Sequence, residues 1–420
     1  MENQKRNISQ SFICKEITIL LLMVLFLIIT AGCSGNSKSN SQKDDFKTVA
    51  SKDTFIKVVP RDTFITVDVS KKYPKKELML QDIMDVEYIA LESTDEFVCQ
   101  GVVLSIGKEI ILIKNSIDDG NIYLFDRNGK GLRKINRRGQ GPEEYVYYMR
   151  CFLDEDNSEI YMDELIRGIK VYDLQGNFLR NIDKEFGWNN KFIFNSEYLI
   201  GKEYNPVEND KPSNNQRFAF LSKQDGSVLK DFRIYFEKRV VWGITTRSGN
   251  AGTAPRPMPI IPYHDSWLLM EPSCDTVFRI TPDYSLMPFI ARTPPIQSMK
   301  PGIFLLPCIF TDDYYFMETV KMEYDLSRDE GFPKTKLAYD RMGNTIFEYT
   351  VVNDDFREKG PVNMTWQETT NNEIAYLQVF EAYELFEANG KGQLKGKLKE
   401  VTEHLDDDPN PVIMLVKYKQ

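Results

Sequence analysis

Two stretches of the chain carry the same pattern 47 residues apart, and this repeat limits the possible folds more than any other feature. One begins at Asn121 and reads NIYLFDRNGKGLRKI, and the other begins at Gly168 and reads GIKVYDLQGNFLRNI. Each has an apolar strand, an aromatic residue followed by Asp, a turn with Gly and a second strand. Because Asp side chains cap such turns and Gly accepts a positive φ, both stretches predict β-hairpins.

Weaker copies of this hairpin follow along the chain. They are FLSKQDGSVLKDF from Phe220, VFRITPDYSLMPFI from Val277 and LAYDRMGNTIFEY from Leu337. Strand-rich repeats of about 40 to 50 residues are typical of β-propeller blades, which bury their faces only against neighbouring blades. A chain of 420 residues is long for one compact layered domain but suits such a repeat architecture. The repeat therefore predicts an all-β propeller.

The glycine-rich stretch NRRGQGPEEY, residues 136–145, lies between two of these units. A phosphate-binding loop runs from a strand through glycines into a helix and carries Lys followed by Ser or Thr. Here the glycines lead into YYMRCFLDED, which has the pattern of another strand, so a nucleotide site is rejected. We predict a connector between two blades, with a motif made of Gly139, Gly141, Pro142, Glu143 and Tyr145.

The same stretch carries a family resemblance. RRGQGPEEY, followed by DEDNSEIYMDE and KVYDLQGNFLRNI, is similar to the NHL-type repeat, and the chain resembles the six-bladed β-propeller lipoproteins of Bacteroidetes. VEYIALES from Val86, CDTVFRI from Cys274 and DDDPNPVIMLVKYK from Asp406 resemble other positions of that family. The resemblance covers most of residues 53–420. It implies six blades and a place in the cell envelope, and it implies little about activity.

The N-terminal residues 1–33 have the pattern of a secretory signal. Lys5, Arg6 and Lys15 are basic, and the apolar run at residues 17–29 is too short for a spanning helix. Thr-Ala-Gly before Cys33 resembles the lipobox of bacterial lipoproteins, which implies that Cys33 is the lipid attachment residue. The alternative is ordinary signal cleavage, which leaves a free cysteine.

Three regions follow from this interpretation: the signal at residues 1–33, a flexible polar tether at 34–52 and the propeller at 53–420. The expected location is the outer membrane, reached through a lipoprotein signal peptide. Asp44 and Asp45 resemble export signals for the cell surface, although they lie further from the cysteine than usual. Periplasmic and cell-surface display both stay open.

The end of the chain predicts how the ring closes. Residues 379–388 switch to helical periodicity, and a second amphipathic run extends from Leu394 to Leu405. A terminal strand, PVIMLVKY, begins at Pro411. We predict that the helices are an insertion in the last blade, and that this blade pairs C-terminal strands with the region near VEYIALES, which removes exposed edges.

Charge and cysteine usage exclude some classes of function. The net charge of −9 and the pI near 5.2 argue against a nucleic-acid partner, since no basic stripe exists to displace counterions. We also expect the protein to be a monomer.

The spacing of the cysteines does not predict a zinc site, because none of them form a CxxC pair. They are interpreted as small buried hydrophobic residues, although a disulfide is permitted outside the cytoplasm. These cysteines are Cys99, Cys151, Cys274 and Cys308.

The sequence offers little catalytic chemistry. His264 and His404 are the two histidines, both interpreted as structural or solvated, and no Gly-x-Ser-x-Gly elbow is present. Asp126, Asp173 and Asp340 recur at turns, where capping explains them. We therefore predict no catalytic residues, no metal ligands and no cofactor.

The most distinctive stretch outside the repeat is WGITTRSGNAGTAPRPMPIIPYHDSW, residues 242–267. Long loops on a rigid scaffold often carry recognition. The candidate binding rim is Trp242, Arg247, Arg256, Tyr263 and His264. The predicted function is a lipid-anchored binding or scaffolding module for an unidentified envelope protein or glycan. The alternative is a metal-dependent propeller enzyme of the calcium type, either a lactonase-like hydrolase or a glycan-active enzyme.

Overall fold

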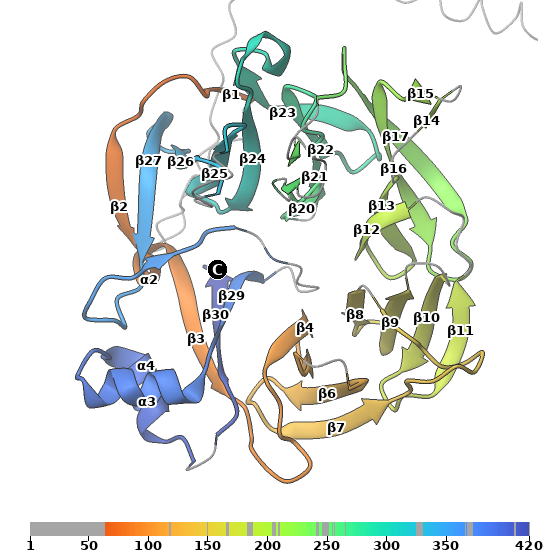
Figure 1. The fold of residues 1–420 in the computed structure, drawn as a ribbon, viewed down its shortest axis with the longest axis vertical. Coiled ribbons are helices and arrows are strands. Elements are labelled where there is room, and N and C mark those ends of the chain that lie inside the picture. The colour runs from red at the N-terminus through yellow and green to blue at the C-terminus, as the bar shows by residue number, and fades with distance from the viewer. Residues whose placement is uncertain are drawn as a thin grey trace, which may run out of the picture. The chain divides into compact units, whose positions relative to one another are not determined.

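A computed structural model describes residues 64–419 except 117–118, 149, 165–167, 183–187, 204–206, 209–210, 241–242, 246–251, 254, 256, 265, 325–330, 366, 368–372 and 407–408. The described residues belong to one compact unit, Val59–Gln420. Within this unit, six sheets of three or more strands surround a central axis (Figure 1). The predicted all-β, six-bladed propeller is therefore confirmed.

Blades 1 to 3 each contain four antiparallel strands, and the first strand of each lies nearest the axis (Figure 1). Blade 1 consists of β4 (Val102–Ile106), β5 (Ile110–Lys114), β6 (Asn121–Asp126) and β7 (Gly131–Asn136). Blade 2 consists of β8 (Arg150–Asp154), β9 (Glu159–Glu164), β10 (Gly168–Asp173) and β11 (Phe178–Ile182). Blade 3 consists of β12 (Trp188–Ile193), β13 (Tyr198–Glu203), β16 (Asn215–Ser222) and β17 (Val228–Tyr235).

Blades 4 to 6 also include strands from the N-terminal part of the unit. Blade 4 consists of β20 (Ile260–Tyr263), β21 (Ser266–Leu269), β22 (Thr276–Ile280), β23 (Leu286–Thr293) and β1 (Ile65–Asp68). Blade 5 consists of β24 (Ile303–Phe310), β25 (Tyr314–Lys321), β26 (Lys334–Asp340), β27 (Thr345–Val352), β28 (Pro361–Val362) and β2 (Lys75–Met79). Blade 6 consists of β29 (Ile374–Phe380), β30 (Val412–Tyr418) and β3 (Met84–Ala90).

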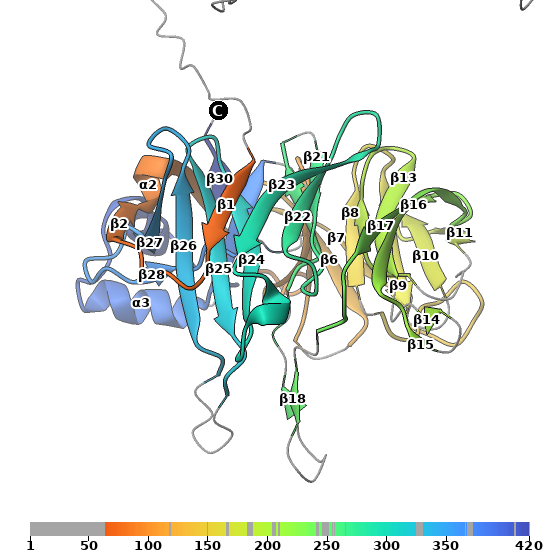
Figure 2. The same cartoon turned by 90° about the horizontal axis from the view of Figure 1, so that it is seen from above.

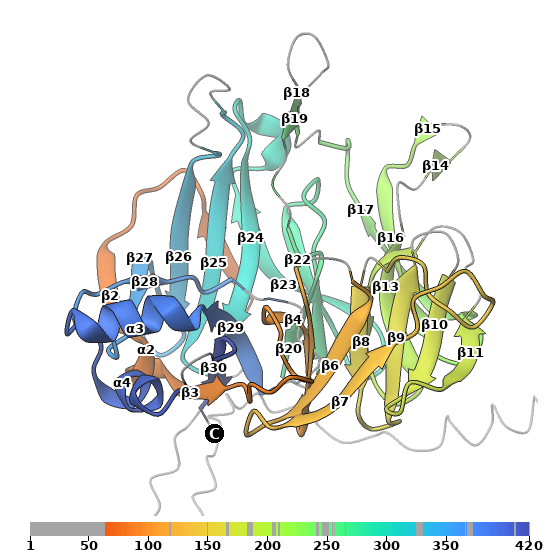
Figure 3. The ribbon, with the colours of Figure 1, turned by 60° about the horizontal axis from the view of Figure 1, so that its bottom comes forward.

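Short elements connect and decorate the blades. Two small hairpins are formed by β14 (Val207–Glu208) with β15 (Lys211–Pro212), and by β18 (Ile244–Thr245) with β19 (Gly252–Thr253). The hairpin of β18 and β19 projects from the ring (Figures 2 and 3). The described helices are α2 (Leu80–Ile83), the 3-10 helix η1 (Ile296–Ser298), α3 (Ala382–Gly390) and α4 (Gly396–Glu403).

The recurring Asp and Gly of the sequence form the outer hairpins. Asp126 Oδ1 accepts hydrogen bonds from two backbone N–H groups of its own turn, at 2.8 and 2.9 Å. Asp173 Oδ1 does the same at 2.9 and 2.8 Å. Gly129 and Gly176 have φ values of +86° and +83°. This left-handed backbone conformation is costly for residues that have a side chain. The repeated Asp and Gly residues of the sequence therefore mark the turns of the outer hairpins.

The strands are apolar on both faces because each blade packs between two others. Ile111, Leu112 and Ile113 of β5 are all fully buried. Ile111 and Ile113 pack with Leu415 of blade 6, whereas Leu112 packs with Leu153 of blade 2. Alternate side chains of one strand point to opposite faces of its sheet, so one run fills two interfaces.

The ring closes through β3 and β30. These strands pair antiparallel along their full length, from Met84 opposite Tyr418 to Ala90 opposite Val412. This is the closure that the sequence predicted. In addition, β1 pairs parallel with β23, and β2 pairs parallel with β27. The N-terminal segment Ile65–Ala90 therefore adds a strand to each of blades 4, 5 and 6.

Both predicted helices lie between β29 and β30, as an insertion in the last blade. Their boundaries differ from the prediction. The first helix was predicted at residues 379–388, but α3 begins at Ala382, because Val379 and Phe380 complete β29. A strand that runs directly into an amphipathic helix presents apolar residues that fit both periods, so the boundary is ambiguous in the sequence.

The four cysteines of the propeller are free thiols. Cys99, Cys151 and Cys308 are buried, and Cys274 is half-buried. Burial raises the pKa of Cys99 to about 11 and that of Cys308 to about 12. These thiols are uncharged at neutral pH and pack as small apolar side chains.

Candidate functional site

The connector at residues 136–145 joins β7 of blade 1 to β8 of blade 2. Its glycines are covered by the carboxylate of Glu144. Glu144 Oε2 accepts a hydrogen bond from the Gly141 N–H at 2.8 Å, and a Cβ atom on Gly139 would collide with the same carboxylate. Because this carboxylate occupies the position that a phosphate would take, the connector lacks an open anion site.

The remaining connector residues attach it to the blades. Lys170 Nζ donates to the Pro142 carbonyl at 2.9 Å, and the Tyr172 hydroxyl donates to the Glu143 carbonyl at 2.8 Å. Tyr145 is buried, and its hydroxyl donates at 2.6 Å to a backbone carbonyl just before β6. These contacts give the motif a structural role between blades 1 and 2.

Of the predicted rim residues, the structure describes Tyr263 and His264, whose ring centroids lie 4.5 Å apart. Tyr263 is 1% exposed, and its hydroxyl lies 2.8 Å from that of Tyr315, so its side chain packs in the core. His264 lies in the turn after β20, with its Nε2 atom 3.6 Å from Asp312 Oδ1 at the surface. The predicted site residues outside the described part of the chain are Cys33, Trp242, Arg247 and Arg256.

A cavity lies in the central channel, between blades 1, 2 and 6. Its volume is about 620 Å³. The lining comes from the first residues of β4 and β8 and from the second half of β29, together with Gln100, Gln367 and Glu381. Figure 1 shows these three strands around the centre of the ring. This site was not predicted from the sequence, because its residues are spread over some 280 positions and come together only through the closure of the ring.

Amide groups and strand edges supply hydrogen-bonding atoms to this channel cavity. Gln100 Oε1 accepts hydrogen bonds from the backbone N–H and the hydroxyl of Ser116, at 2.8 and 2.5 Å. Gln367 Oε1 accepts the N–H of Leu377 at 3.3 Å. Gln378 also lines the cavity. The amide side chains are therefore partly held in place by the surrounding structure, which favours a defined geometry for a ligand.

Two charged side chains of opposite sign belong to the described lining, Arg150 and Glu381. Arg150 donates to Asn190 Oδ1 at 2.9 Å, and its guanidinium lies 5.4 Å from the centre of the Phe192 ring. Burial raises the pKa of the nearby Cys151 thiol, which therefore stays protonated. Among the described residues of the whole unit, no three His, Cys, Asp or Glu side chains are grouped as a metal site would need.

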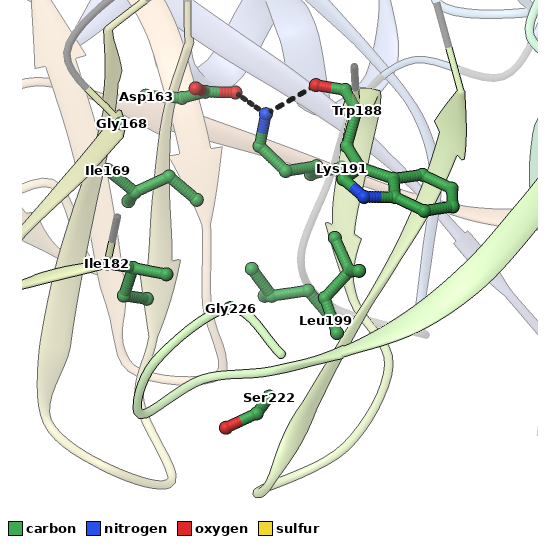
Figure 4. Close-up of a pocket in the computed structure, with 10 residues that line it drawn as sticks. Asp163, Gly168, Ile169, Ile182, Trp188, Lys191, Leu199, Ser222 and Gly226 are labelled. Carbon is green, nitrogen blue, oxygen red and sulfur yellow. Dashed lines mark hydrogen bonds and ion pairs between the residues drawn. The ribbon is translucent and has the colours of Figure 1, made fainter. Parts of the chain in front are cut away.

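A second, much smaller cavity lies between blades 2 and 3 (Figure 4). Its volume of about 20 Å³ is enough for a single water molecule. At one end, Lys191 Nζ lies 2.8 Å from the Asp163 carboxylate and donates to the Trp188 carbonyl at 2.9 Å. Ile182 and Leu199 lie further from this ion pair and also line the cavity (Figure 4). This cavity is a feature of blade packing.

Comparison with one solved structure supports the fold, and two others show weaker similarity. A Bacteroides fragilis protein that is named as exported superposes with a TM-score of 0.53 and 15% identity, covering 85% of this chain and 100% of its own. U3-55K gives a TM-score of 0.35 at 9% identity and covers 78% and 98% of the two chains. BamB from Moraxella catarrhalis gives 0.31 at 9% identity, with 76% and 84% covered.

Three further findings concern the helices, the curated proteins and the family of the chain. None of the described helices is long and apolar enough to span a lipid bilayer. A search of curated proteins finds no match. One family model matches residues 64–417, which is nearly all of the propeller, and its description is "Domain of unknown function (DUF4934)". The chain therefore belongs to the DUF4934 family.

Proposed function

We propose that this protein is a binding module of the cell envelope that holds its ligand in the central channel. The observation that carries the proposal is the cavity of about 620 Å³ between blades 1, 2 and 6. Ligand sites are typically concave spaces of about 300–1,000 Å³ in which a few polar groups stand among apolar ones. Because three sheets form the walls, several blades contact one ligand at the same time.

The ligand proposal is tested by native mass spectrometry on the full chain after incubation with a small-molecule and peptide extract of the cell envelope. Gln378→Trp places a large side chain in the channel cavity, whereas Leu132→Trp places the same ring on the exposed face of β7. We expect wild type and Leu132→Trp to retain the same bound mass, and Gln378→Trp to lose it. Thermal melting verifies that both variants are folded.

Retention of that mass by a folded Gln378→Trp variant would contradict a channel site. So would the absence of any bound mass on the wild-type chain across extracts of the envelope. Loss from both folded variants would contradict it as well, because Leu132 is not part of the channel lining and its replacement should leave a channel ligand bound.

We also propose that the module is an outer-membrane lipoprotein attached through Cys33. The support comes from the basic segment, the short apolar run and Thr-Ala-Gly-Cys in the sequence. The similar Bacteroides fragilis protein is also named as exported. More than one acyl chain is needed for durable anchoring, since each buried methylene contributes roughly 0.8 kcal/mol.

Membrane fractionation tests the anchor. Cys33→Ser should move the protein from the membrane fraction to the soluble fraction. The matched control is Cys14→Ser, which removes the other cysteine of the signal region and should leave the protein in the membrane fraction. Unchanged fractionation of Cys33→Ser would contradict the anchor while leaving the channel proposal intact.

A further inference from the structure

We infer that four lysines between β1 and β2 form a second membrane contact, which binds the anionic head groups of a lipid surface. The four are Lys71, Lys72, Lys75 and Lys76. Together with the two residues between them they are called the lysine segment, residues 71–76. The inference rests on the proposed function, because the proposed lipid at Cys33 brings the protein to a membrane. It adds a part of the propeller itself to the membrane contact.

The lysine segment lies on the outside of the ring, where the chain passes from blade 4 to blade 5 (Figure 1). All four lysine side chains are exposed. An aspartate carboxylate lies 3.5 Å from Lys71 Nζ, and another lies 3.8 Å from Lys76 Nζ. Within the described part of the chain, Lys72 and Lys75 belong to no ion pair. The segment therefore presents an excess of positive charge to the solvent.

The backbone of the segment is held in place at two points. The Tyr73 hydroxyl donates to the Asp68 carbonyl at 3.0 Å and accepts the Asp68 N–H at 3.2 Å. The Pro74 carbonyl accepts the Glu348 N–H of β27 at 2.8 Å. Groups on a fixed backbone lose less conformational freedom on binding than groups on a mobile tail. This anchoring therefore favours binding by the lysines.

Protection of a sheet edge explains only part of the lysine pattern. β2 is the end strand of its sheet, and lysines on such an edge discourage pairing with another chain. Lys75 and Lys76 belong to β2, so this role accounts for them. Lys71 and Lys72 lie before the strand, in the link from β1. Their charges need a different explanation.

The chemistry of the segment favours a lipid surface over a protein partner. The core of a protein interface is rich in apolar and aromatic side chains. Among residues 65–97, all of which the structure describes, no large apolar side chain is exposed. The basic residues of the segment are all lysines, which bind phosphate as point charges, whereas arginine recognises it through paired hydrogen bonds. A layer of anionic head groups fits such charges without a defined geometry.

The net charge of −9 does not prevent this contact. Interactions between exposed charges are screened beyond about 10 Å at 0.1 M salt, so the charges nearest to the membrane decide. The lysine segment and Cys33 both belong to the N-terminal 76 residues of the chain. A lipid chain combined with a polybasic patch is one of the ways in which two signals give stable membrane attachment.

Vesicle co-sedimentation tests the inference. The full chain carries Cys33→Ser, so that no acyl chain contributes, and the vesicles contain phosphatidylcholine either alone or mixed with phosphatidylglycerol. We expect binding to the mixed vesicles at low salt, release at high salt, and no binding to phosphatidylcholine alone. Absence of binding to the mixed vesicles, or equal binding to both kinds, overturns the inference.

Two double variants of this chain locate the contact. Lys72→Gln with Lys75→Gln removes two charges from the segment and should weaken vesicle binding about tenfold or more. Lys397→Gln with Lys399→Gln is the matched control, because it removes two exposed lysines of α4 and should leave binding unchanged. Thermal melting verifies that both variants are folded. Equal loss in the two variants overturns the inference.

Sedimentation velocity without vesicles examines a different partner, a second copy of the chain. If the Cys33→Ser chain forms a dimer that the Lys72→Gln, Lys75→Gln variant loses, and vesicles are not bound, the lysines bind acidic residues of that copy. This result overturns the lipid inference.

Fractionation after a high-salt wash judges the proposed anchor separately, because the wash removes an electrostatic contact and leaves an acyl chain inserted. If the wash releases the Cys33→Ser chain but not wild type, and the mixed vesicles are not bound, the anchor stands and the lysine inference is wrong. If the vesicles are bound and the wash treats both chains alike, the anchor is wrong and the lysine inference is supported.

Discussion

The ammonium of Lys223 lies 2.5 Å from the carboxylate of Asp154, and the two residues are 1% and 3% exposed. Asp154 ends β8 of blade 2, and Lys223 directly follows β16 of blade 3, so the ion pair joins neighbouring blades. Asn157 also donates to Asp154 at 2.9 Å. Desolvation lowers the pKa of Lys223, which shows that the ammonium depends on its partner to stay charged in this position.

Replacing one residue of this ion pair should lower the free energy of unfolding more than replacing both. Asp154→Ala leaves a buried ammonium without its carboxylate and should lower the free energy of unfolding by about 3–5 kcal/mol. The double variant Asp154→Leu, Lys223→Met replaces both charges with apolar volume and should recover most of this loss. Urea denaturation measures all three proteins. If the double variant lost more unfolding free energy than Asp154→Ala does, the two charges would not stabilise each other, and the prediction would be wrong.

Alanine substitutions at Gly129 and Gly392 distinguish the effect of backbone strain from that of steric crowding. Both have positive φ values, +86° and +68°. A Cβ atom on Gly129 would collide with the Ala90 carbonyl, whereas nothing lies within 4 Å of one on Gly392. Gly392→Ala should cost about 1–2 kcal/mol from the left-handed conformation alone. Gly129→Ala should cost a further 1–3 kcal/mol or so, because blades 6 and 1 must move apart. Similar melting temperatures for the two variants would contradict this difference.

Deletion of Pro411–Gln420 should abolish cooperative unfolding. The deleted segment contains β30, which pairs with β29 on one side and β3 on the other. Without it, the ring is open and two strand edges are exposed. Calorimetry should show a broad, weak transition in place of a single peak. Deletion of Lys419 and Gln420 alone is the control and should leave the transition nearly unchanged, since β30 ends at Tyr418. An unchanged melting temperature after the longer deletion would rule out this closure as a stabilising element.

The turn at Asp225 should contribute to stability only above acidic pH. The Ser227 hydroxyl donates to Asp225 Oδ1 at 2.8 Å and is the largest cause of the lowered pKa of Asp225. A carboxyl whose pKa is lower in the folded state stabilises the fold fully above its unfolded pKa, and this contribution disappears as pH falls through the folded pKa. The melting temperature of Ser227→Ala should therefore fall below that of wild type at pH 5, and the two should converge by about pH 2. A gap that stays constant over this range would show that the hydroxyl acts independently of the charge of Asp225.

Short sequence patterns were sufficient to predict the blades but not the channel cavity. Asp126 and Gly129 determine a turn through contacts within five residues, so the hairpin is readable from a short window. The closure by β3 and β30 was predictable because two apolar strands at opposite ends of a ring must find partners. The start of α3 was misplaced, because Val379 and Phe380 fit both strand and helix periods.

The channel cavity was not predictable because its residues share no pattern. Gln100, Arg150 and Gln367 are ordinary polar residues in three separate parts of the chain, and only the curvature of the ring brings them to one space. Tyr263 illustrates the converse. Its position beside a Gly- and Pro-rich stretch suggested an exposed rim, but it belongs to β20 and packs in an aromatic cluster with Phe289, Phe310 and Tyr315.

The N-terminal segment Ile65–Ala90 supplies outer strands to the last three blades. During synthesis, these strands emerge before their partners, so each stays unpaired in its blade until β23, β27 or β30 has been made. Such pairing between distant parts of a chain slows folding. Closure of the ring therefore waits for β30 near the end of the propeller, so a nascent chain that lacks β30 cannot yet join β3 to the sheet of blade 6.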